Sequence, residues 1–195
     1  LVVWNSSYSR QGTTLAEAYA QLKNDADQVR HYLNTQKIKP EELVFSAIST
    51  AAVREPVLNA EGEYAGERAV GYRLTQNVTL KSKDIDLVEK ISRQATDLIQ
   101  QGINLNSEPP AYYYTKLSEL KINLLAKATK DGYIRAKTIA DNSEAGLGNL
   151  RRANMGVFQI TAQYSNENYT YMGAYNTSDR NKTAQITVKM DFAAD

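Results

Sequence analysis

The hydrophobic residues of this chain change their spacing along the sequence, and this change of period constrains the fold more than any other feature. Near the start, Val2, Trp4 and Tyr8 share one parity, which is the spacing of a β-strand. Leu15, Tyr19 and later apolar residues up to position 33 then recur every three or four positions, as on an amphipathic helix. Strand spacing returns after that helix, so the fold must combine both element types.

Local signals mark where further elements begin and end. Thr14 and Glu17 have the spacing of a capping box, which predicts the first turn of the first helix. Asp84 is a typical N-cap residue, and Gly102 is suited to the left-handed end of the helix that follows it. After the first helix the sequence predicts strands at 43–54 and 70–80, helices at 84–102 and 115–140, and strands at 158–164 and 184–192.

The order of these elements predicts the fold class. It reads β-α-β-β-α-β followed by α-β-β, which is typical of an α+β fold with an antiparallel sheet and helices packed on it. Strands follow one another too often for a doubly wound parallel sheet. We interpret residues 1–195 as a single domain, with sub-units 1–115 and 116–195 as the alternative division.

Three details of the second half can be checked against a structure. The alternation at 184–192 predicts a buried face formed by Ile186, Val188 and Met190. Gly132 lies in the middle of the predicted third helix, where glycine costs about 1 kcal/mol relative to alanine, so we expect a bend or interruption there. The glycine-containing segment 146–149 is interpreted as the end of that helix and a turn.

Composition excludes several classes of function. The formal net charge is +1, so the chain lacks the positive field of a nucleic-acid-binding protein. It has no cysteine and one histidine, which argues against disulfides, a cysteine-ligated metal and a multi-histidine metal site. No apolar run is long enough to span a membrane. We therefore expect no nucleic acid partner, no cofactor, no metal and no membrane span.

The candidate catalytic groups each have a simpler structural interpretation. His31 is placed off the apolar stripe of its helix, as a surface residue is. Asp84 is explained by helix capping, and Glu41 and Glu42 would point to opposite sides of an extended chain. Arg151 and its neighbour Arg152 are expected to be solvated. The sequence therefore nominates no catalytic, cofactor-binding or metal-binding residue, and we expect the protein not to be an enzyme.

Tyrosine is the least ordinary feature of the composition, with 13 residues. Many of them gather in two segments. Aromatic rings with a polar tip suit half-buried surfaces, so these segments favour a subunit interface or a ligand groove, although tyrosine is also common in strands. The candidate interface residues are Tyr112, Tyr113, Tyr114, Tyr169, Tyr171 and Tyr175.

The order and spacing of several segments resemble those of the SIMPL-domain family. The resemblance covers essentially the whole chain. It rests on the opening strand at 2–7, the helix at 15–33, the Gly71-Tyr72-Arg73-Leu74 strand that leads into 84–88, the small residues around Ala128 and Ala136, and the closing stretch at 182–188.

The resemblance implies a setting for the protein more than a reaction. Bacterial members are envelope or periplasmic proteins with a secretion signal, and animal members are partners of a kinase. This chain starts at Leu1 without a methionine, so we expect a signal peptide or anchor upstream that has been removed. The family brings no accepted enzymatic activity, and it suggests a role in stress, including oxidative stress.

Two hypotheses of different classes follow. The first is a non-enzymatic envelope protein of SIMPL type that acts through protein–protein contacts or self-assembly, as a homo-oligomer or with an unidentified protein partner. The second is a small-molecule binding module that uses the tyrosine-rich loop surfaces. A symmetric apolar contact would favour the first hypothesis, whereas a concave aromatic pocket would favour the second.

Overall fold

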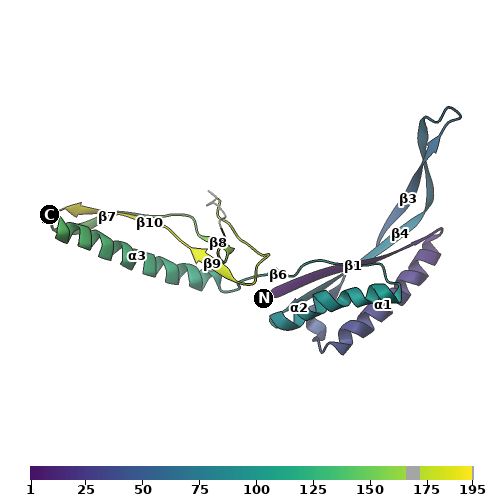
Figure 1. Cartoon of the computed structure of the whole chain (residues 1–195), viewed down its shortest axis with the longest axis horizontal. Coiled ribbons are helices and arrows are strands. Elements are labelled where there is room, and N and C mark those ends of the chain that lie inside the picture. The colour runs from purple at the N-terminus through teal and green to yellow at the C-terminus, as the bar shows by residue number, and fades with distance from the viewer. Residues whose placement is uncertain (166–171, 195) are drawn as a thin grey trace. The chain divides into compact units, whose positions relative to one another are not determined.

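The computed structural model describes residues 1–165 and 172–194, and the chain divides into two compact units, Leu1–Ala111 and Tyr112–Asp195. We call them unit 1 and unit 2, and their elements are labelled in Figure 1. Each unit combines helical and strand segments, and the strands pair antiparallel. The chain is therefore an α+β protein, as the sequence predicts.

Unit 1 is a sheet with helices packed on it. Its elements are β1 (Val2–Gly12), α1 (Leu15–Thr35), the 3-10 helix η1 (Pro40–Glu42), β2 (Leu43–Phe45), β3 (Ser49–Leu58), β4 (Tyr64–Ser82), α2 (Ile85–Gln94), the 3-10 helix η2 (Ala95–Gln101) and β5 (Leu105–Ser107). The strand order is β2-β4-β1-β5, with β3 also paired to β4. β1 pairs antiparallel with β4 along its whole length.

The core of unit 1 lies between one face of this sheet and the helices. Trp4 and Tyr8 of β1 are each 1% exposed, and Val78 and Leu80 of β4 are completely buried. Val88 and other residues of the helices cover them, and Figure 1 shows α1 and α2 on the same side of β1. The alternation of buried and more exposed side chains that the sequence predicts for the first strand is confirmed.

The buried stripe of α1 differs from the predicted one at its start. Leu15 and Tyr19 are exposed, whereas Ala18 is buried and the stripe then runs through Leu22. The capping residues lie where the sequence places them, since the Thr14 hydroxyl accepts the Glu17 N–H at 3.2 Å. The predicted stripe was wrong at its start because the buried face of α1 begins at Ala18 and also includes a charged residue.

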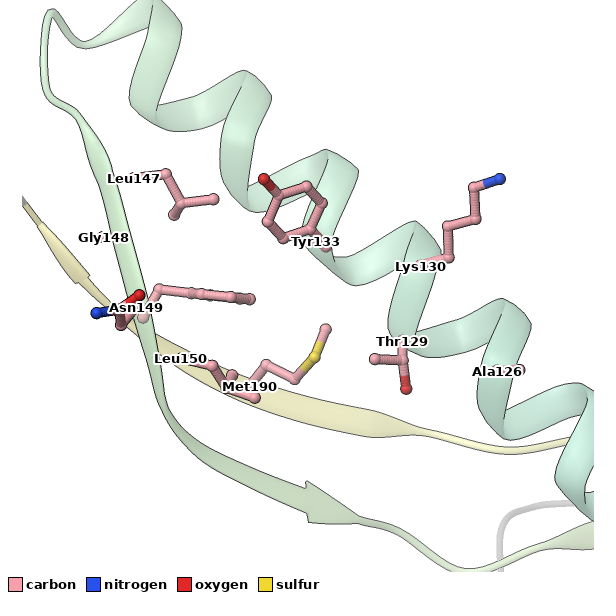
Figure 2. Close-up of a pocket in the computed structure, with 10 residues that line it drawn as sticks. Ala126, Thr129, Lys130, Tyr133, Leu147, Gly148, Asn149, Leu150 and Met190 are labelled. Carbon is pink, nitrogen blue, oxygen red and sulfur yellow. The ribbon is translucent and has the colours of Figure 1, made fainter.

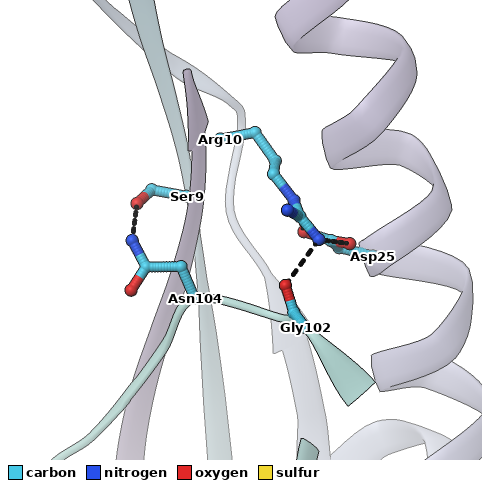
Figure 3. Close-up of polar contacts among 5 residues, drawn as sticks. All are labelled: Ser9, Arg10, Asp25, Gly102 and Asn104. Carbon is cyan, nitrogen blue, oxygen red and sulfur yellow. Dashed lines mark hydrogen bonds and ion pairs between the residues drawn. The ribbon is translucent and has the colours of Figure 1, made fainter. Parts of the chain in front are cut away.

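That charged residue is Asp25, and its partner Arg10 joins three parts of unit 1 (Figure 3). Its side chain is completely buried on α1 and faces Arg10 of β1. Arg10 Nε donates to Asp25 Oδ2 at 2.6 Å, and Arg10 Nη2 donates to Asp25 Oδ1 at 2.8 Å and to the Gly102 carbonyl at 2.7 Å. The hydrogen bond to Asp25 raises the pKa of Arg10. A buried carboxylate is tolerated here because it has a two-pronged cationic partner.

A second set of linked hydrogen bonds also stabilises unit 1. The Tyr8 hydroxyl donates to Gln76 Oε1 at 2.5 Å, and Gln76 Nε2 donates to the Ser46 carbonyl at 2.8 Å. Burial raises the pKa of Tyr8 to about 12, so the phenol keeps the proton that it donates to Gln76 even in alkaline solution. These bonds fix β1, β4 and the segment after β2 to one another.

β3 and the first half of β4 form a two-stranded arm. β1 ends opposite Tyr72, so residues 64–71 of β4 pair with β3 and not with β1. In β3 every residue except Val53 is exposed. The turn is held by Asn59, whose Oδ1 accepts the N–H groups of Glu61 and Glu63. The predicted hairpin is confirmed, although the strand expected at 43–54 is divided into β2 and β3, and both strands of the hairpin extend further toward the turn than expected.

Unit 2 contains α3 (Leu117–Asn142), β7 (Leu147–Met155), β8 (Gln159–Ala162), β9 (Lys182–Gln185) and β10 (Val188–Ala194), and the short strand β6 (Ala111–Tyr112) lies at the boundary with unit 1. β10 pairs antiparallel with β7, and β8 with β9. We call the β7–β10 pair the ribbon. Of the residues of unit 2 that the structure describes, four are buried: Ala140, Gln159, Ile160 and Thr161.

Three expectations about unit 2 were wrong. Residues 184–192 are not one strand with a buried face: β9 and β10 pair with different partners, and Ile186, Val188 and Met190 are only half-buried. α3 runs through Gly132 without interruption. The segment expected to be a turn contains Leu147, the first residue of β7. A two-stranded ribbon covered on one face by one helix cannot enclose its side chains.

The Arg10–Asp25 pair allows a direct test of unit 1. We expect Arg10→Leu to destabilise unit 1 by about 3–5 kcal/mol, because it leaves a buried carboxylate without its cation. Adding Asp25→Leu should recover most of that loss, since an apolar pair of similar volume often replaces a buried ion pair at little cost. Urea unfolding followed by the fluorescence of Trp4, the single tryptophan, measures both variants. A loss below about 1 kcal/mol for Arg10→Leu would contradict this role of the pair.

Candidate functional site

The structure brings three of the candidate tyrosines, from the two predicted segments, together in unit 2. The rings of Tyr113 and Tyr175 lie 6.4 Å apart between centroids with an interplanar angle of 37°. The Tyr175 hydroxyl donates to the Tyr114 carbonyl at 3.4 Å. These three residues, which we call the tyrosine cluster, are 38%, 44% and 42% exposed in chain order. Tyr169 and Tyr171 lie outside the described residues.

The cluster is anchored from below by the buried part of unit 2. The Ile160 N–H donates to the Ala174 carbonyl at 2.7 Å, and the Asn176 N–H donates to the Ile160 carbonyl at 2.9 Å. Ile160 is 1% exposed, so the segment that carries Tyr175 is attached to the most buried strand of the unit. On the other side, the Tyr112 N–H donates to the Thr177 carbonyl at 2.7 Å. The backbone therefore holds the exposed rings in a defined arrangement.

A partly buried lysine supports the same segment. Lys182 of β9 donates from Nζ to the Asn176 carbonyl and lies 3.4 Å from Asn176 Oδ1. Burial lowers the pKa of Lys182. The ammonium group is thereby used as an internal hydrogen-bond donor, which fixes the loop next to Tyr175.

The chemistry available at the cluster is that of a contact surface. Three aromatic rings offer broad apolar faces, and their hydroxyl groups can donate and accept hydrogen bonds. Rings of this kind lose few degrees of freedom when they become buried, so they contribute strongly at interface centres. The arrangement suits recognition of another surface.

A cavity of about 740 Å³ lies between α3 and the ribbon (Figure 2). Met190 and Tyr133 point into the space between helix and strands, whereas Lys130 points away from it. The rings of Tyr133 and Phe192 meet edge to face, with centroids 6.0 Å apart. The lining residues are Ala126, Thr129, Lys130, Tyr133, Leu147, Gly148, Asn149, Leu150, Met190 and Phe192. None of the six candidate tyrosines is among them.

Sequence analysis missed this cavity but contained one signal for it. Gly132 was taken as a point of weakness in α3, yet a Cβ atom there would collide with the Met190 Cε. The glycine therefore gives room to the flexible end of the Met190 side chain, which lies against α3 at this point. Ile139, near the end of the same helix, is 70% exposed.

The charged residues considered as catalytic candidates are either exposed or engaged in local structural contacts. His31 is exposed on α1, as predicted. Asp84 caps α2, with its Oδ1 accepting the Leu87 N–H at 3.0 Å. Glu42 accepts the Ser82 hydroxyl at 2.7 Å. The predicted capping role of Asp84 is confirmed, and the carboxylate of Glu42 is used in a hydrogen bond inside unit 1.

Two further observations concern the described residues 1–165 and 172–194. No group of three or more His, Cys, Asp or Glu side chains in these ranges could hold a metal ion. None of their helices is long and apolar enough to cross a membrane.

Comparison with known proteins identifies one relationship. A family model described as SIMPL, protein of unknown function (DUF541), matches residues 1–194. A search of curated proteins found no match. The family assignment therefore covers both units of the chain and all of the features described above.

Gly132 provides a test of how α3 and the ribbon pack. We expect Gly132→Leu to displace Met190 and destabilise unit 2 by about 1–3 kcal/mol, because the added side chain overpacks the contact. Gly132→Ala is the matched control, since Met190 can turn aside and the helix gains about 1 kcal/mol of propensity. Combining Gly132→Leu with Met190→Ala should restore part of the loss. Urea unfolding followed by circular dichroism measures all three, and a Gly132→Leu chain as stable as the parent would refute the close approach.

Proposed function

This chain belongs to the SIMPL family, and from that premise we propose that it is a non-enzymatic protein that acts through protein–protein contacts, chiefly by self-association. The family description assigns no activity. The proposal therefore depends on what the surface of unit 2 can do.

The exposure of apolar side chains in unit 2 carries the proposal. Ile122 and Ile139 of α3 are 69% and 70% exposed, and Met155 of β7 is 63% exposed. Monomeric proteins leave single apolar residues exposed, but many of them on one small unit mark an interaction surface. The tyrosine cluster adds aromatic rings to the same unit. A protein partner would shield these groups, and a second copy is the partner that is always present.

The charged side chains support the same interpretation because several have structural roles. Asp25 neutralises Arg10, Asp84 caps α2 and Glu42 binds Ser82. Each is committed to holding an element in place. Groups used in this way are poorly placed to exchange protons with a substrate.

A small-molecule binding function is the second candidate, and the cavity beside Tyr133 and Phe192 favours it. This candidate site is not the one that the sequence suggested, because the tyrosines of the tyrosine-rich loops do not line the cavity. A parent chain that stays monomeric at all concentrations, and whose melting temperature rises with an apolar ligand, would favour this second candidate.

We place the protein in the bacterial cell envelope, with a role in the response to stress, on the strength of the family resemblance. Fractionation of cells that express the full-length gene product measures the location, and recovery in the cytoplasm alone would contradict it.

The tyrosine cluster can be tested by light scattering at increasing protein concentration. We expect the parent chain to self-associate, and the variant Tyr113→Ser, Tyr114→Ser, Tyr175→Ser to associate at least about tenfold more weakly. Central aromatic residues commonly contribute more than 1 kcal/mol each to an interface. The substituted side chains are exposed, so the fold should be retained, which circular dichroism can confirm.

The matched control is Tyr164→Ser, because Tyr164 is 92% exposed and lies outside the cluster. It should associate like the parent. A monomeric parent would contradict self-association, and an oligomer that is indifferent to the triple change would show that the cluster is not the contact.

A further inference from the structure

The outer edge of β10 is open and regular. Among the residues that the structure describes, β10 pairs with β7 alone. The ribbon has two register shifts, and both place the additional residues in β7, so that β10 itself continues without a bulge. An open, regular edge offers unpaired backbone N–H and C=O groups to another strand.

The other long open edges of the chain carry features that hinder pairing. β3 contains Pro56, which has no N–H to donate. The free part of β4 contains Gly66 at a φ of +128° next to a register shift. β7 carries the adjacent Arg151 and Arg152 and the irregular register. Proline, bulges and charged side chains are the usual means of protecting an edge. β10 has neither a proline nor a bulge, and its two charged residues, Lys189 and Asp191, are of opposite sign.

The sequence of β10 is complementary to itself in one antiparallel register. Side chains keep their faces only if residues of equal parity lie opposite each other. If the twofold axis of the pair passes between the two Met190 residues, Lys189 of each copy lies opposite Asp191 of the other copy. This contact occurs twice, once on each side of the axis. Centring the pair on Lys189 or on Asp191 would set like charges opposite each other, which is unfavourable. Charge therefore selects the Met190-centred register.

In the same register, the apolar faces of the two ribbons would form one continuous surface. Val188 of one copy would lie opposite Phe192 of the other, and the two Met190 residues would meet at the axis. In the single chain, Lys189 and Asp191 are exposed on the other face and take part in no ion pair among the described residues. Pairing would give these charges partners and extend the surface that covers the half-buried apolar residues.

The spacing of helices also permits this contact. Two paired two-stranded ribbons have their centres about 10 Å apart, because neighbouring strands are about 4.8 Å apart. α3 lies on the Met190 face of its ribbon, so two α3 helices would lie on the same face of a four-stranded sheet. Packed helices are usually 8–10 Å apart. The two helices could therefore lie side by side without displacing the strands.

We propose that two copies of this chain form a symmetric dimer by antiparallel pairing of their β10 strands in the Met190-centred register. The proposal rests on the proposed function of self-association and names a surface for it that is separate from the tyrosine cluster. The twofold contact is isologous, so each copy contributes the same edge.

Charge reversal on β10 tests the register. Lys189→Glu sets glutamate opposite aspartate twice, and Asp191→Lys sets lysine opposite lysine twice. Each variant should weaken the dimer at least about tenfold in sedimentation equilibrium. An equimolar mixture of the two variants should associate, because every cross-strand pair in the mixed dimer has opposite charges. The double variant Lys189→Asp, Asp191→Lys should associate like the parent for the same reason.

The matched control is Arg151→Glu on β7, which should leave the dimer unchanged. A parent that is monomeric at every concentration overturns both the dimer and the proposed function. A parent that associates, with both single variants associating equally well, overturns the β10 contact and leaves self-association standing. Failure of the mixture to associate when each variant alone is monomeric overturns the Met190-centred register.

Discussion

A side chain is shielded from water only when elements cover it on more than one side, and the two units of this chain meet that condition unequally. In unit 1, β1 and β4 form the centre of a sheet that two helices cover, and residues such as Trp4 and Leu80 are enclosed. In unit 2 one helix lies on a ribbon of two strands, and four of the described residues are buried. A two-stranded sheet is marginal in water unless it packs against another element, and in unit 2 α3 supplies that packing for the ribbon.

Unit 1 also has the polar contacts that make a fold unique. The Arg10 guanidinium links β1 to α1 and to the end of η2, and Tyr8 with Gln76 links the sheet to the segment after β2. The corresponding contacts of unit 2 are concentrated around Tyr175 and Lys182. They order the loop that presents the tyrosine cluster, while α3 and the ribbon are left with exposed apolar side chains. Unit 1 is therefore held by internal polar contacts, whereas unit 2 presents the surface to which we assign the proposed self-association.

Local patterns predicted the α+β class, the alternation of β1, the caps at Thr14 and Asp84, and the hairpin, because these features depend on neighbours in sequence. The patterns failed where a distant partner decides the outcome. Asp25 interrupts an apolar stripe and is buried only because Arg10 reaches it. Gly132 resembles a helix breaker until Met190 is placed against it. The tyrosine segments were recognised as unusual, but only the fold brings Tyr113 to Tyr175.

Under the proposed function, the exposed apolar side chains of unit 2 are covered by another protein molecule. Amide hydrogen exchange of the parent chain, measured over a wide range of protein concentration, tests it most directly. If copies associate, mass action predicts that protection in α3 and β10 rises with concentration, while protection in α1 of unit 1 stays constant. If the protection of α3 and of β10 does not change with protein concentration, unit 2 does not associate in this way.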